Sequence, residues 1–199
     1  MAAGDKVGII DGIHEMQGDN TVFEDLRFPF IGQQIDTSSG RIDYDYQENG
    51  IGFQANARYP EEPICMISQL SHAIKLGSAL YPHIHWIQEQ AAFPNWLMEY
   101  RIYNNGDTVP AVWTPAIIAS HTYAWVAGAL LQLSSFPVID ASALTLLSGF
   151  VDVRIYRDST NASGLFGGAD PVAAVVLAKE FDIHIELNTI GSKTETSKF

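Results

Sequence analysis

The sequence predicts an all-β protein, a β-sandwich of the jelly-roll type. Short segments in which apolar and polar residues alternate recur along the chain, and turn residues such as Gly, Pro and Asn separate them. Regular short strands of this kind favour a sandwich, for which a jelly roll is the usual arrangement at 199 residues. A chain of 199 residues is expected to form one large domain. No apolar run approaches the roughly 20 residues that span a bilayer, so we expect no membrane contact.

The chain divides into three parts by composition. Four glycines and the lack of a clear periodicity predict an N-terminal arm over residues 1–21. The alternating segments lie within residues 22–188, which we expect to form the sandwich domain. Residues 189–199 are polar and predict a short flexible C-terminal tail.

The first strands of the domain are expected around a hairpin. Residues 41–46 alternate between polar and apolar side chains, and Asn49-Gly50 follows them as the pair with positive φ that tight hairpins favour. Alternation resumes at Ile51 on the return strand. A further strand is expected over residues 64–70.

The remaining strands follow from the same pattern. They are expected over residues 83–89, 96–103, 149–157 and 179–187. In the last of these, the residues expected to face the core are Phe181, Ile183, Ile185 and Leu187, and those expected to face outward are Glu180, Asp182, His184 and Glu186. Residues 123–133 and 141–148 are apolar runs too short to distinguish a helix from a strand.

Two histidines share one face of an expected strand. Because side chains alternate along a strand, His83 and His85 point to one side, and Ile84 and Trp86 point to the other. Two neighbouring imidazoles can bind a metal ion, line a catalytic pocket or serve as hydrogen-bonded structural residues. The choice decides whether the protein is an enzyme.

One motif around these histidines partly resembles the metal site of the cupin family. The matching positions are Gly77, His83, His85 and Glu89 for the first cupin motif, and His184 and Asn188 for the end of the second. The resemblance implies a jelly-roll enzyme with three imidazoles and one carboxylate around a divalent metal ion.

The sequence departs from the cupin pattern in three ways. Trp96 stands where a glycine is expected after the glutamate, and Lys179 and Phe181 replace the expected proline and glycine. Cupin ligands point into the barrel, whereas His184 lies opposite four large apolar residues that are cheaper to bury. We therefore predict structural histidines and no catalytic, cofactor or metal site, with the cupin-like metal enzyme as the third alternative.

The net charge of −12 limits the partners of the protein. A surface that binds a nucleic-acid duplex needs lysine and arginine to displace counterions, so we expect no direct nucleic-acid binding. The 4 Trp, 8 Tyr and 10 Phe residues supply much aromatic surface, and aromatic side chains concentrate at protein interfaces.

A series of segments resembles a family of proteins from tailed bacteriophages and prophages that accompany virion structural proteins. The segments are Val22–Pro29, Pro82–Trp86, Trp96–Asn104 and Phe181–Ile185, in this order. The resemblance covers roughly residues 22–187. The family carries no established catalytic residues, so it implies no site residue for this chain.

What the resemblance implies is a capsid decoration or cement protein of jelly-roll type. Such a protein is made in the host cytoplasm, sits on the capsid exterior of the virion as a homotrimer, and contacts the major capsid protein. A neck, tail or fibre protein that binds host glycans is the second alternative. On this reading the protein is a structural component and no enzyme.

Overall fold

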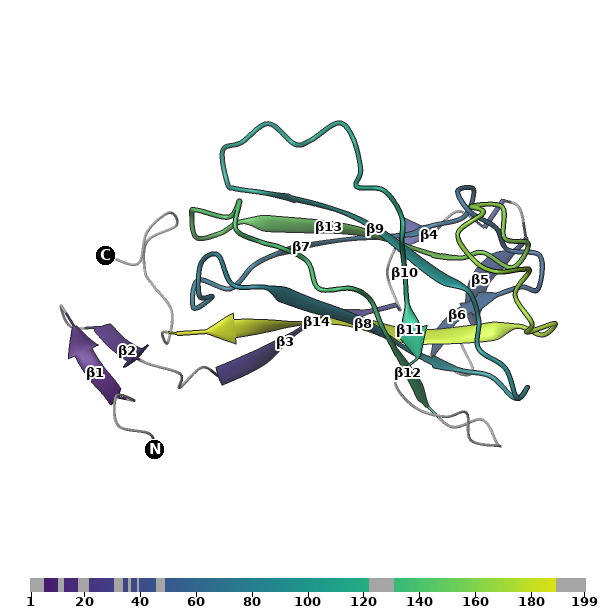
Figure 1. Cartoon of the computed structure of the whole chain (residues 1–199), viewed down its shortest axis with the longest axis horizontal. Coiled ribbons are helices and arrows are strands. Elements are labelled where there is room, and N and C mark those ends of the chain that lie inside the picture. The colour runs from purple at the N-terminus through teal and green to yellow at the C-terminus, as the bar shows by residue number, and fades with distance from the viewer. Residues whose placement is uncertain are drawn as a thin grey trace.

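The computed structural model describes residues 6–10, 13–17, 22–30, 34–35, 37–38, 40–45, 49–121 and 131–188. Throughout these residues the regular structure consists of antiparallel strands, and none of them forms a helix that could cross a membrane. Two large sheets stack as two layers (Figure 1). The predicted all-β sandwich is confirmed.

The larger sheet has seven strands in the order β11-β12-β8-β14-β6-β5, with β3 also paired to β14. Their bounds are β3 (Val22–Pro29), β5 (Ile42–Asp45), β6 (Gly50–Phe53), β8 (Leu80–Ile87), β11 (Ser120–His121), β12 (Gln132–Ser135) and β14 (Val176–Leu187). The long strand β14 pairs with β8 along one side and with β6 and then β3 along the other. It is therefore the central strand of this sheet.

The smaller sheet has five strands in the order β10-β9-β13-β7-β4. Their bounds are β4 (Gln34–Ile35), β7 (Ile64–Gln69), β9 (Trp96–Tyr103), β10 (Ile117–Ile118) and β13 (Phe150–Arg157). The loop between β9 and β10 rises over the outer side of this sheet (Figure 1).

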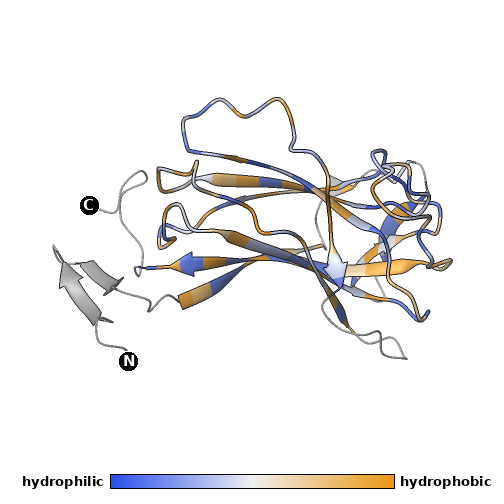
Figure 2. Ribbon diagram, in the orientation of Figure 1, coloured by the Kyte–Doolittle hydropathy of each residue, from blue (hydrophilic) through white to orange (hydrophobic). Residues whose placement is uncertain are grey.

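The hydrophobic core lies between the two sheets. Alternate residues of the central strands are fully buried there, among them Ile84, Phe181 and Ile183 from the larger sheet and Met98 and Val153 from the smaller one. Figure 2 shows hydrophobic and hydrophilic residues interleaved along the strands. The predicted inward face of the last strand is confirmed, with Leu187 half-buried at its end.

The short apolar runs have two outcomes. Residues 132–135 form β12, whereas residues 122–130 lie outside the described part of the chain. Residues 141–148 form neither helix nor strand, although Leu144 and Leu147 contribute to the core. An irregular segment can bury alternate apolar side chains without sheet pairing, so its composition alone did not distinguish the states.

The Asn49-Gly50 turn was predicted wrongly. Asn49 has a positive φ of 54°, but Gly50 is already the first residue of β6 and pairs with Asp45. The connection is therefore longer than a two-residue turn. Gly50 is required for another reason, because a Cβ at this position would lie 2.6 Å from the carbonyl oxygen of Ala178.

The expected N-terminal arm contains a small sheet. Strands β1 (Lys6–Ile10) and β2 (Ile13–Gln17) pair with each other and with neither large sheet. The sequence analysis did not predict this pair, because residues 6–17 show no clear alternation of polar and apolar residues. The expected tail, residues 189–199, lies outside the described residues.

Candidate functional site

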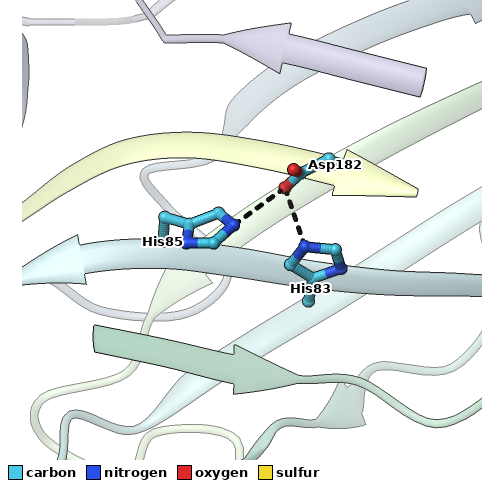
Figure 3. Close-up of side chains that lie close together, drawn as sticks. All are labelled: His83, His85 and Asp182. Carbon is cyan, nitrogen blue, oxygen red and sulfur yellow. Dashed lines mark ion pairs between the residues drawn. The ribbon is translucent and has the colours of Figure 1, made fainter. Parts of the chain in front are cut away.

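The pairing of β8 with β14 brings a carboxylate to the two neighbouring histidines. Asp182 on β14 lies directly opposite His83 on β8, and Glu180 lies opposite His85. Since Ile84 and Phe181 fill the core side of these strands, the histidines and Asp182 project from the outer face of the larger sheet. Figure 3 shows both imidazoles turned toward the Asp182 carboxylate.

The three side chains form a tight cluster. The Oδ1 atom of Asp182 lies 3.2 Å from Nε2 of His83 and 3.5 Å from Nε2 of His85. One ligand atom from each residue lies within 4.8 Å of the other two. The side chains of His83 and Asp182 are 7% and 5% exposed, so this part of the outer face is nearly closed to water.

Charge and burial act against each other in the cluster. Burial alone would raise the pKa of Asp182, but the attraction of the two imidazoles outweighs it and holds the pKa well below its ordinary value. Burial likewise opposes the charged form of His83, yet Asp182 raises the pKa of this imidazole overall. The cluster therefore stabilises an ionised carboxylate next to a positive charge.

Asp182 has few hydrogen-bond donors for a buried carboxylate. Its Oδ1 atom is buried and accepts no hydrogen bond of good geometry, despite the two nearby imidazoles. Arg27 on β3 lies opposite Asp182, but its guanidinium pairs with Glu180 at 2.9 Å instead. The two histidines are therefore the side chains that stabilise the charge of Asp182.

A third histidine borders the cluster. The ring of His184 lies 4.5 Å from the ring of His83, centroid to centroid, and its Nε2 atom pairs with Oδ1 of Asp25 at 3.0 Å. A pocket of about 250 Å³ opens beside these two rings. Its lining consists of Tyr81, Pro82, His83, Leu133, Ser135, Phe136, Val138 and His184.

This arrangement differs from the cupin set considered in the sequence. Glu89 lies beyond the end of β8 and lines a separate pocket with Asp45 and Ala174. The carboxylate beside the two histidines is that of Asp182 and not that of Glu89, and the cluster faces away from the core. Sequence reasoning had Asp182 on the outer face, but only the register of β14 against β8 shows that it meets His83.

The outer face of the smaller sheet carries a different polar cluster. Asp152 pairs with Arg101 and accepts a hydrogen bond of 2.9 Å from the hydroxyl of Tyr103. The guanidinium of Arg101 lies 4.2 Å from the ring of Trp113, in the loop between β9 and β10. The Pro110 carbonyl of this loop also accepts a hydrogen bond from Arg101.

Glu99 completes this second cluster. Its two carboxylate oxygens accept hydrogen bonds of 2.7 Å and 2.8 Å from the hydroxyls of Tyr59 and Tyr156. Arg154 lies 3.8 Å from the same carboxylate and 4.0 Å from the Trp113 ring. Both carboxylates of this face therefore have full sets of donors, as expected for structural polar groups.

A separate histidine lies on the core side of the larger sheet. His121 stacks on Phe93 with ring centroids 4.1 Å apart, and its Nδ1 atom lies 2.8 Å from the Ser134 hydroxyl. Burial lowers the pKa of His121 to about 4. This imidazole is neutral near pH 7 and has no carboxylate partner within ion-pair distance among the described residues.

No known protein family, curated protein or solved structure matches this chain.

Proposed function

We propose that the protein is a structural component of a bacteriophage virion, a decoration or cement protein on the capsid exterior, and not an enzyme. The series of segments within residues 22–187 that resembles virion-associated proteins supports this proposal. Three of these segments coincide with strands at the centre of the sandwich, namely β8, β9 and β14. The resemblance therefore concerns the framework of the domain.

The order of the strands supports a jelly roll. From β6 to β9 each successive strand lies in the other sheet, and the same holds from β12 to β14. Neighbouring strands are thus β12-β8-β14-β6 in one sheet and β10-β9-β13-β7 in the other. Two interleaved Greek keys have this order, and jelly rolls are common among viral capsid proteins, lectins and cupins.

The observation that carries the proposal is an apolar surface on the outer face of the larger sheet. Phe23 on β3 and Tyr81 on β8 are 52% and 37% exposed, and their rings pack edge to face at 5.9 Å. An exposed aromatic pair on the face of a sheet is typical of a protein interface.

We assign this surface to a second copy of the chain. A closed ring of three copies buries the surface on every subunit and matches a three-fold position on a capsid. The arm, residues 1–21, then contacts the major capsid protein, and three arms together bind more tightly than one. The contact between copies and the contact with the capsid can be tested separately.

For the contact between copies, we would change Phe23 and Tyr81 together to Ser in the full chain. Light scattering at micromolar concentration should show a trimer for the unchanged protein and a monomer for the double variant. Val112→Ser is the matched control, because Val112 is 80% exposed on the loop over the other sheet. A monomeric unchanged protein would refute the trimer.

For the contact with the capsid, removal of residues 1–21 should leave the trimer intact and abolish binding to capsids. Undiminished binding would refute the role of the arm. Electron microscopy of particles then locates the protein. Density on the neck, tail or fibre, in place of the head, would favour the glycan-binding alternative over a decoration protein.

A further inference from the structure

We propose that His83, His85 and Asp182 bind a divalent transition-metal ion, with Zn²⁺ as the best fit, on the outer face of the larger sheet. This inference goes beyond the virion role and does not depend on it. It replaces the sequence-based expectation of purely structural histidines, because the structure adds a carboxylate that the sequence motif did not contain.

The distances from the carboxylate oxygen to the two imidazole nitrogens suit the ligands of one metal ion. Zn²⁺ binds imidazole nitrogen and carboxylate oxygen at about 2.0–2.2 Å, so two ligands of a tetrahedral ion lie about 3.3–3.6 Å apart. The Oδ1 atom of Asp182 lies 3.2 Å and 3.5 Å from the two Nε2 atoms. One ligand nitrogen of each imidazole lies within 4.8 Å of the other, so an ion fits between the three atoms once rotation of the imidazole rings brings these nitrogens to the tetrahedral spacing.

The orientation of His83 also favours a metal ion beside its Nε2 atom. The backbone of Tyr81 hydrogen-bonds this imidazole, and since Nε2 faces Asp182, the nitrogen left for that bond is Nδ1. A metal ion takes the place of the proton that otherwise gives this pair its positive charge, because a neutral His83 with its proton on Nδ1 presents the lone pair of Nε2 toward the carboxylate oxygen. A backbone partner for the second nitrogen is also the usual way in which a metal-binding histidine is oriented.

One oxygen of the Asp182 carboxylate lacks a hydrogen-bond donor of good geometry. The side chain of Asp182 is 5% exposed, and its Oδ1 atom accepts no hydrogen bond of good geometry. A buried carboxylate without donors is costly unless it is paired or coordinates a metal ion. The nearest guanidinium, that of Arg27, is paired with Glu180. The oxygen that lacks donors is the one aimed between the imidazoles.

The number of protein ligands is that of an ion with one open position. Two imidazoles and one carboxylate leave one position of a tetrahedral ion open, and the pocket of about 250 Å³ beside His83 can hold the water that fills it. His184 lies next to this pocket, but its Nε2 atom pairs with Asp25. The same ligand set also suits Fe²⁺, so the experiment compares metals.

The main experiment measures metal binding by the full-length protein. After dialysis against a chelator, calorimetric titration with ZnCl₂ should show saturable binding of about one ion per chain, and Zn²⁺ should raise the melting temperature. Asp182→Asn and His85→Asn should each weaken binding at least about tenfold. His121→Asn is the matched control, since it removes a histidine from the same sheet on the core side, and it should leave the affinity unchanged.

A second measurement covers the case in which the Asp182 variant fails to fold. Co²⁺ added to the unchanged protein should give the strong visible absorption of a tetrahedral site, and Zn²⁺ should abolish it. Saturable binding of Fe²⁺ in preference to Zn²⁺ would keep the site and change the metal. Absence of saturable binding of Zn²⁺, Fe²⁺, Mn²⁺ and Ni²⁺, or an unchanged affinity in the folded Asp182→Asn variant, would overturn the proposal and leave a protonated histidine–aspartate pair.

Discussion

The two sheets bury acidic side chains on their outer faces in opposite ways. On the smaller sheet, Asp152 and Glu99 accept hydrogen bonds from tyrosine hydroxyls and lie beside arginines. On the larger sheet, Asp182 lies between two imidazoles, and one of its oxygens accepts no hydrogen bond of good geometry. Both faces thus contain buried carboxylates, but only one of them has its donors in place.

The difference separates a structural cluster from a candidate ligand site. Trp113 and its loop cover the arginines of the smaller sheet, and both carboxylates of that cluster have their donors within the chain, although Nε of Arg101 and of Arg154 lacks a hydrogen-bond partner. The cluster on the larger sheet borders an open pocket through His83, and its three ligand atoms lie within 4.8 Å of one another. Complete sets of donors indicate a role in stability, whereas an incomplete set in a buried site indicates a missing ligand.

The largest effect is expected from Asp152→Asn. This change removes the charge that pairs with the largely buried Arg101 and weakens the hydrogen bond from Tyr103. Loss of one partner of a buried ion pair costs about 3 kcal/mol in the free energy of unfolding. Chemical denaturation measures this loss. A change below about 1 kcal/mol would show that the cluster on the smaller sheet is not structural.

A smaller effect is expected from His121 as the pH falls. The pKa of about 4 in the folded protein lies below the ordinary 6.5, so the unfolded chain binds the proton first. The contribution of His121 to stability is therefore complete above pH 6.5 and decreases as the pH falls toward 4. The decrease amounts to about 2–3 kcal/mol at most.

The comparison with His121→Phe isolates this titration. Phenylalanine keeps the stacking on Phe93 and cannot bind a proton, so the variant should lose less stability than the unchanged protein between pH 6.5 and 4. Denaturation curves at several pH values give the difference. Parallel curves for the two proteins would show that His121 titrates normally in the folded state.

The smallest effect is expected from Asp182→Asn in the presence of a chelator at about pH 8, where free imidazoles are neutral. At this pH the imidazoles that stabilise the charge of Asp182 lose their own charge, and the Oδ1 atom has no good donor, so the free energy of unfolding should change by less than about 1 kcal/mol. Asp152→Asn is the direct control. An equal loss in both variants would abolish the distinction between the two faces.

Much of the fold follows from local sequence patterns. The strand Trp96–Tyr103 has the predicted bounds, and the strand expected over residues 149–157 begins one residue later, at Phe150. Both strands alternate because one of their faces lies on the core. The pairing of β1 with β2 was not predicted, because residues 6–17 carry no such alternation. The prediction of a two-residue turn at Asn49-Gly50 was wrong because the pairing register of β5 and β6, and not local preference, places Gly50 in a strand.

The candidate site was half predictable. Alternation places His83 and His85 on one face, and it also places Asp182 and His184 outward on the last strand. What joins them is the pairing of strands almost 100 positions apart, which no local pattern encodes. Spacing suggested Glu89 as the acidic partner because it is near in sequence, but β8 ends before it. The Asp-X-His sequence on an outward strand face was the signal for the true partner.

The position of β14 has a consequence for how the domain folds. This strand supplies the partner for β8, β6 and β3, yet it comes after all of them along the chain. During synthesis these three strands emerge from the ribosome before their shared partner. β6 can pair with β5 and β8 with β12, but the edges that pair with β14 stay open until residues 176–187 follow. Late, non-local pairing of this kind slows folding and leaves the nascent chain open to aggregation. Chains that stop before Val176 should therefore be recovered as aggregates and not as smaller folded domains.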